Sequence, residues 1–264
     1  VNIGESWRNY PNETLYETLA HEAAHTADGT CHFPFNYGKD GVHYVSEVTN
    51  RRTAWIEGWA EYNGGIFSPN HRAQINDATH AMVQESPDSS KEDQIYDQLS
   101  NPHFMTRLRN EGTVGAILLN IDGQGKYRNQ LMETFKNQNM NWRTQSLKDR
   151  DIVSFTNDYM YSNPEQAKRT LLAIDCATHF RASDDRLRKL YGPLANEYLK
   201  ERHELLKKYY ENWGQTNFEL FELLEKDLLK PQVEKDDTFE LLPPGGADDV
   251  VLEPLALLGE TSIN

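Results

Sequence analysis

The chain has 264 residues, a length typical of one fairly large domain or of a domain with an appendage. Apolar residues make up 38% of it, and 13 Tyr, 10 Phe and 5 Trp are enough to build a core, so a disordered chain is excluded. The chain has a net charge of −14, and the phosphate backbone of a nucleic acid would repel it, so we expect no nucleic-acid partner. No apolar run approaches the roughly 18 residues that a membrane-spanning helix needs, so we expect no membrane span.

The first residues and the cysteines leave the cellular location open. The chain starts at Val1 rather than at Met, which we interpret as a processed product or a fragment. Asn12-Glu13-Thr14 fits an N-glycosylation acceptor but also suits the start of a helix, so secretion is one option. Cys31 and Cys176 are too few for a disulfide framework, and they form either one bridge or two free thiols.

The first predicted element is a helix over residues 14–29, TLYETLAHEAAHTADG. Thr14 with Glu17 three residues later is a capping signal, and a glycine closes the other end. His21 and His25 are four residues apart and therefore lie on one face of this helix, where both imidazoles can hold one metal ion. Glu22 stands beside them in the H-E-x-x-H arrangement of zinc hydrolases, in which the glutamate acts on a water as a general base.

Strand signals are sparse. The best is Val42 to Val48, which follows a turn over residues 37–41, and we expect one short β-hairpin there.

A second helix is expected over residues 53–65, TAWIEGWAEYNGG. Glu57 and Glu61 are four residues apart, so one face of that helix presents two carboxylates. A carboxylate oxygen is a good third ligand for a zinc ion that two histidines already hold.

The rest of the chain is predicted to be mostly helical. Residues 91–140 contain Gly112 and Gly115 inside an apolar run, where close packing of helices would suit glycine. Residues 164–230 resemble several helices in series, with caps at Ser183 and at Thr216.

The last 34 residues differ in composition from the rest of the chain. They carry one basic and eight acidic residues, with breaks at Pro and Gly. We therefore expect an extended or disordered appendage over 231–264.

The two motifs together resemble those of the gluzincins, which are zinc metallopeptidases with H-E-x-x-H on one helix and a glutamate on the next. Residues 55–62, WIEGWAEY, are similar to the gluzincin segment W-x-x-E-G-x-A-x-aromatic, although here the glutamate follows the tryptophan by two positions instead of three. The resemblance implies one zinc ion held by His21, His25 and Glu57, with Glu22 as the general base. It gives Glu61 the role of a carboxylate that orients a ligand histidine, and Glu61 as the third ligand is the alternative.

The chain also departs from the gluzincin pattern. Thirty-one residues separate His25 from Glu57, and only twenty precede His21, where gluzincins have a substrate-aligning sheet. The G-x-M-E-N segment of the aminopeptidase branch is absent, so the choice between endopeptidase and exopeptidase stays open.

We therefore expect a mainly α fold with zincin-like active-site helices, a helical lower lobe and a small β-hairpin, the upstream sheet being missing or reduced. The predicted domain covers 1–230, with the metal site in 1–65 and the helical lobe in 66–230. The oligomeric state stays open.

The predicted function is zinc-dependent hydrolysis of peptide bonds in a peptide or protein substrate. Two alternatives remain: a weakly active or inactive zinc-binding helical protein with an interaction role, and a zinc hydrolase acting on another bond. The residue that stabilises the transition state is not identified, and the sequence offers as candidates Tyr159, Tyr161, His103, His179 and Arg109.

Overall fold

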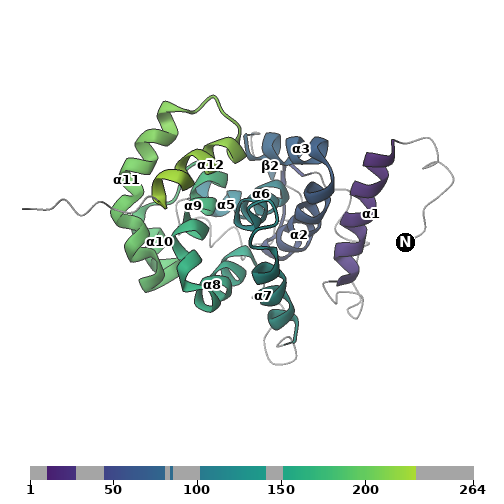
Figure 1. The fold of residues 1–264 in the computed structure, drawn as a ribbon, viewed down its shortest axis with the longest axis horizontal. Coiled ribbons are helices and arrows are strands. Elements are labelled where there is room, and N and C mark those ends of the chain that lie inside the picture. Colours follow the sequence, from purple (N-terminus) through teal and green to yellow (C-terminus); the bar gives the residue numbers. More distant parts are fainter. Residues whose placement is uncertain (1–10, 28–44, 81–83, 86–101, 141–150, 230–264) are drawn as a thin grey trace, which may run out of the picture. The chain divides into compact units, whose positions relative to one another are not determined.

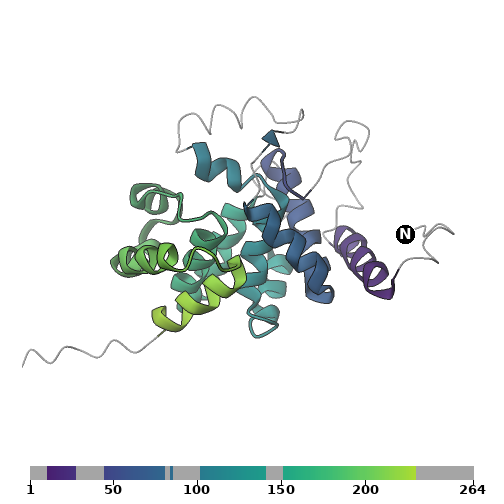
Figure 2. The ribbon, with the colours of Figure 1, turned by 90° about the horizontal axis from the view of Figure 1, so that it is seen from above.

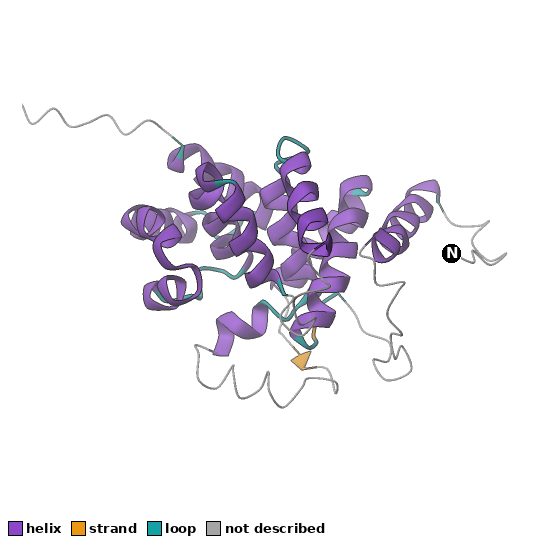
Figure 3. Ribbon diagram, turned by 90° about the horizontal axis from the view of Figure 1, so that it is seen from below, coloured by secondary structure: helices purple, strands orange, loops and turns teal. Residues whose placement is uncertain are grey.

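The computed structural model describes residues 11–27, 45–80, 84–85, 102–140 and 151–229, and this part of the chain is mainly α-helical (Figures 1 and 3). The mainly α prediction is thus confirmed. None of the helices in these ranges is long and apolar enough to span a membrane.

The elements follow one another along the chain with short connections in the second half. The helices are α1 (Asn12–Ala27), α2 (Arg51–Phe67), α3 (Pro69–His80), α5 (Pro102–Arg107), α6 (Glu111–Asp122), α7 (Arg128–Met140), α8 (Ile152–Ser162), α9 (Ala167–Ala177), α10 (Asp184–Tyr191), α11 (Asn196–Glu211) and α12 (Asn217–Leu228). Two 3-10 turns, Pro164–Gln166 and Gly192–Ala195, precede α9 and α11.

The strands are two residues each, β1 (Glu47–Val48) and β2 (Gln84–Glu85), and they pair in parallel. Glu47 and Val48, at the end of the predicted hairpin strand, therefore pair with Gln84 and Glu85 and not with a neighbouring strand of a hairpin. The turn and the first residues of the predicted strand lie outside the described residues. Asn110 stabilises β1 further, because its side-chain amide donates to the carbonyls of Val45 and Glu47 at 3.2 and 3.1 Å.

Helix α6 is buried along its whole length and packs against α2, α3, α9 and α12 (Figure 2). Its sequence, EGTVGAILLNID, is apolar on nearly every face, as a central helix requires. The prediction that Gly112 and Gly115 serve close packing is confirmed. A Cβ atom at Gly112 would lie 2.5 Å from the Cβ of Ala78 on α3, and one at Gly115 would lie 3.2 Å from the Cβ of Glu61 on α2.

Helix α2 has one face that packs in the core and one face that carries two carboxylates. Trp55 and Trp59 are buried among aromatic side chains of α7 and α8, and the ring of Trp59 stacks on Phe135 at a centroid distance of 3.9 Å. Glu57 and Glu61 lie on the other side, towards α1. Aromatic packing on one face therefore determines which way the two carboxylates point.

The predicted caps of the later helices are present. The hydroxyl of Ser183 accepts from the backbone of Arg186 at the start of α10, and Thr216 and Glu219 form the capping box of α12. All described residues belong to one compact unit, Val1–Lys230, and the predicted tail over 231–264 lies outside them.

Candidate metal centre

Helix α1 carries the H-E-x-x-H motif and packs against α2. It begins at Asn12, two residues before the predicted cap, so Thr14 is already inside the helix and the capping role predicted for it is wrong. The helix starts earlier because its hydrogen-bond ladder begins at Pro11, whose carbonyl accepts from the amide of Leu15. The predicted end at Gly29 lies outside the described residues.

The structure brings three of the predicted site residues together. The Nε2 atoms of His21 and His25 are 3.2 Å apart, and Oε2 of Glu57 lies 3.5 Å from the first and 3.2 Å from the second. These three atoms form a nearly equilateral triangle with ligands from two helices. Among the described residues this is the one group of three His, Cys, Asp or Glu side chains that is close enough to share a metal ion.

The size of this triangle fits zinc. Zinc bonds of about 2.0–2.1 Å in tetrahedral geometry place neighbouring ligand atoms about 3.3 Å apart. Two imidazole nitrogens and one carboxylate oxygen are also a donor set that zinc takes in enzymes. The residues present therefore fit one zinc ion with a fourth position left for a water or a substrate.

The group is partly open to solvent. The side chains of His21, His25 and Glu57 are 21%, 14% and 14% exposed, whereas a purely structural zinc site is closed by four protein ligands. Glu22 is exposed on α1, and no ion pair between it and another described residue is seen. A carboxylate that is adjacent to a ligand and not engaged elsewhere suits a general base.

Glu61 connects the group to His71, which no sequence motif pointed to, and through it to Glu17, which the sequence had placed in a helix cap. Its Oε1 atom is 3.6 Å from Nδ1 of His21, which is the ring nitrogen turned away from the triangle. Its Oε2 atom is 2.5 Å from Nε2 of His71 on α3, and Nδ1 of His71 is 2.9 Å from a carboxylate oxygen of Glu17 on α1. The result is a chain of contacts from Glu17 through His71 and Glu61 to His21.

His71 holds this arrangement because it is buried between two carboxylates. Burial lowers the pKa of its imidazole, but the contact with Glu61 and the charges of Glu61 and Glu17 outweigh burial, so the pKa is raised. The ring also lies against α2 where the chain has glycine, since a Cβ atom at Gly64 would lie 3.0 Å from two ring atoms. The supporting residues therefore extend past residue 65, the predicted limit of the metal site, and they come from three helices.

Further contacts fix the helix that carries Glu57. The hydroxyl of Tyr62 donates to Asp122 at 2.9 Å, at the carboxyl end of α6. Arg128 makes two hydrogen bonds with the same carboxylate, at 3.0 and 2.9 Å. At the other end of α2 the side chain of Asn50 accepts from the amide of Thr53 and caps the helix.

Of the five candidates for transition-state stabilisation, three bind other residues, one is exposed, and the side chain of the fifth lies outside the described residues. Tyr159 donates to Gln130, Arg109 donates to the carbonyl of Thr49, and Tyr161 is 67% exposed. His179 is enclosed between Tyr209 and the carbonyl of Thr79, and the side chain of His103 lies outside the described residues. The contacts seen for Tyr159, Arg109 and His179 are with residues outside the metal group.

The cysteines supply no second metal site in the described residues. Cys176 is a buried free thiol whose pKa is raised by burial, and Cys31 lies outside the described residues.

Comparison with known proteins adds no family. No protein-family model matches the sequence, no curated protein is significantly similar to it, and no solved structure is significantly similar to its fold.

Proposed function

We propose that this chain is a zinc-dependent peptidase whose metal ligands are His21, His25 and Glu57. The observation that supports it best is the triangle of ligand atoms, with edges of 3.2–3.5 Å, next to the exposed carboxylate-bearing residue Glu22. The resemblance of the two motifs to those of gluzincins supports peptide bonds as the substrate class.

Each residue has a defined task in this proposal. A zinc ion, when bound, lowers the pKa of a water and polarises a carbonyl group. Glu22 takes a proton from the attacking water as the new C–O bond forms, and it passes that proton to the amine that leaves when the C–N bond breaks. Glu61 keeps the ring of His21 oriented through its Nδ1 atom, and His71 with Glu17 keeps Glu61 in place.

The first test is stoichiometry and turnover. We expect one zinc per chain by elemental analysis, since the described residues contain one group of this kind, and cleavage of casein or of a peptide library by the zinc-loaded protein. Zinc without cleavage would favour the weakly active or inactive zinc-binding protein. Cleavage of ester or sugar substrates alone would favour the other hydrolase class.

The second test is Glu22→Gln, which is isosteric but cannot accept the proton. We expect zinc binding and the thermal unfolding temperature to be retained, while hydrolysis falls at least about a hundredfold, because general-base catalysis contributes about that much. Glu204→Gln on α11 is a matched control at a second exposed glutamate, and it should leave the rate unchanged. An unimpaired Glu22→Gln enzyme would show that another group is the base.

A further inference from the structure

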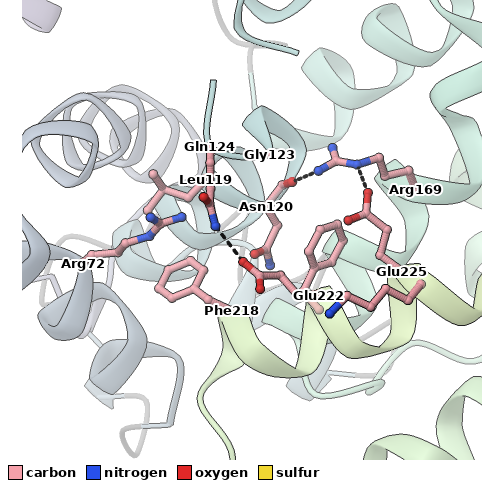
Figure 4. A pocket seen from close by; sticks show the side chains of 11 residues that line it. Arg72, Leu119, Asn120, Gly123, Gln124, Arg169, Phe218, Glu222 and Glu225 are labelled. Atoms are coloured by element: carbon pink, nitrogen blue, oxygen red, sulfur yellow. Dashed lines mark hydrogen bonds and ion pairs between the residues drawn. The ribbon is translucent and has the colours of Figure 1, made fainter. Parts of the chain in front are cut away.

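A second site is suggested by a cavity on α3, α6, α9 and α12. Its volume is about 240 Å³, and its lining includes Arg72, Leu119, Gln124, Phe218 and Glu222 (Figure 4). This volume is below the roughly 300–1,000 Å³ of pockets for drug-sized ligands, so the cavity suits a smaller molecule.

Most charges at this cavity have partners within the protein. Arg169 forms an ion pair with Glu225 and donates to the carbonyls of Asn120 and Ile121, which leaves it little capacity for a ligand. Glu222 accepts from the side-chain amide of Gln124 at 2.8 Å.

Arg72 and Lys226 are the exceptions, since no ion pair of either side chain is seen among the described residues, and of the two only Arg72 has a buried donor atom without a partner. The guanidinium carbon of Arg72 lies 4.8 Å from the centre of the Phe218 ring. Figure 4 shows both side chains at one end of the cavity. The Nε atom of Arg72 is buried without a hydrogen-bond partner among the described residues, and no ion pair of its side chain is seen there. Because a buried donor without a partner costs free energy, such an atom at a cavity indicates a missing acceptor.

The environment of Arg72 selects the kind of acceptor. A guanidinium placed over an aromatic ring keeps its N–H groups available at its edge, where a carboxylate can accept two parallel hydrogen bonds. Phe218 and Leu119 add apolar surface beside this edge.

We infer that this cavity binds a small aliphatic carboxylate, with Arg72 as the anchor of the acid group and with Phe218 and Leu119 against the aliphatic part. The inference is independent of the proposed peptidase function, because no metal ligand lines the cavity.

The test uses 4-methylpentanoate and its neutral isostere 4-methylpentanamide, titrated calorimetrically into the full chain after removal of metal with EDTA. We expect the acid to bind at least tenfold more tightly than the amide, because the amide lacks the charge that Arg72 recognises. Equal affinities of the acid and the amide would overturn the inference. Absence of binding of the acid would also overturn it and would show that Arg72 pairs within the protein in solution. This comparison needs no variant and holds even where a substitution impairs folding.

Variants then locate the bound acid. Arg72→Gln should weaken binding of the acid at least tenfold, Arg72→Lys should weaken it less, and Arg188→Gln on α10, an exposed control, should not change it. The two histidines of the metal-free group can also attract a carboxylate, so His21→Ala serves as the second control and should leave the affinity unchanged. If His21→Ala abolishes binding and Arg72→Gln does not, the acid occupies the metal centre and the inference is wrong.

Discussion

At the scale of single residues, Glu57 and Glu61 have the same side chain but different surroundings. Glu57 contacts both ligand histidines with one oxygen, whereas Glu61 contacts His21 on its other ring nitrogen and also touches His71. The two carboxylates therefore differ in the distance from the place where a metal would sit, and this difference can be measured.

We predict a graded loss of zinc affinity in three variants, measured by competition with a chromophoric chelator. Glu61→Ala should weaken zinc binding by roughly 10- to 100-fold, as is typical for a residue that orients a ligand. Glu57→Ala should weaken it more, because a ligand is lost, and His71→Asn should weaken it less, because His71 acts through Glu61. The reverse order of the two glutamates would make Glu61 the ligand.

His179 gives a prediction about pH. Its Nε2 atom lies 2.5 Å from the carbonyl of Thr79 and its Nδ1 atom 2.5 Å from the hydroxyl of Tyr209, so the neutral ring donates to Thr79 and accepts from Tyr209. Burial lowers its pKa to about 4 from an ordinary value of 6.5.

Between pH 6.5 and 4 the unfolded chain binds more protons at this position than the folded one, so stability must fall as the pH falls. We expect His179 to contribute up to about 3 kcal/mol to this loss, measured by urea unfolding from pH 7 to 4. His179→Gln should show a smaller dependence on pH over this interval. An identical dependence in the variant would mean that the folded protein accommodates the protonated ring.

At the scale of elements, α1 contributes two of the three proposed ligands but little apolar surface. Of its described side chains Ala24 is the one buried apolar residue, and it belongs to the core, while His21, His25 and Glu17 make charged or polar contacts with α2 and α3. Helix α6, in contrast, is held by apolar packing along its whole length. The docking of α1 on α2 therefore depends on polar groups that a metal would join.

We predict that zinc protects α1 against amide hydrogen exchange and that EDTA removes this protection. The binding energy of a metal that bridges two helices stabilises their association, whereas a helix that buries few apolar side chains opens locally at low cost. Exchange in α6 should not change and serves as the internal control. If zinc does not slow exchange in residues 12–27 of the wild-type chain, or slows it equally in Glu57→Ala, then α1 is held by other means.

At the scale of the whole molecule, the described residues form one helical unit and the acidic segment follows it. Its eight acidic residues and its Pro and Gly breaks disfavour a packed structure of its own.

We predict that truncation before Glu234 leaves the unfolding temperature and the far-UV circular dichroism of the remaining chain nearly unchanged, because acidic residues and Pro and Gly breaks divide the apolar residues of the tail into short clusters. Removal of α12 by truncation before Thr216 is the contrasting variant and should unfold the protein, since Leu220, Phe221 and Leu224 are buried. If the variant truncated before Glu234 aggregates, leucines of the tail pack on the helical unit.

The sequence by itself determined the helical nature of the protein and the residues of the candidate metal group. Both follow from local rules: His21 and His25 share a helix face because they are four residues apart, and Thr216 with Glu219 caps α12 through neighbouring backbone groups. The choice of Glu57 as the group's third member also depended on a motif within one helix. Such features need no knowledge of distant parts of the chain.

Only the tertiary structure decided what supports that group. His71 follows no motif, and its position between Glu17 and Glu61 results from the packing of α1, α2 and α3. The parallel pairing of β1 with β2 and the cavity around Arg72 likewise join segments that are distant in sequence. Such contacts depend on the closing of long loops and on the burial of whole helix faces, which no local pattern of residues encodes.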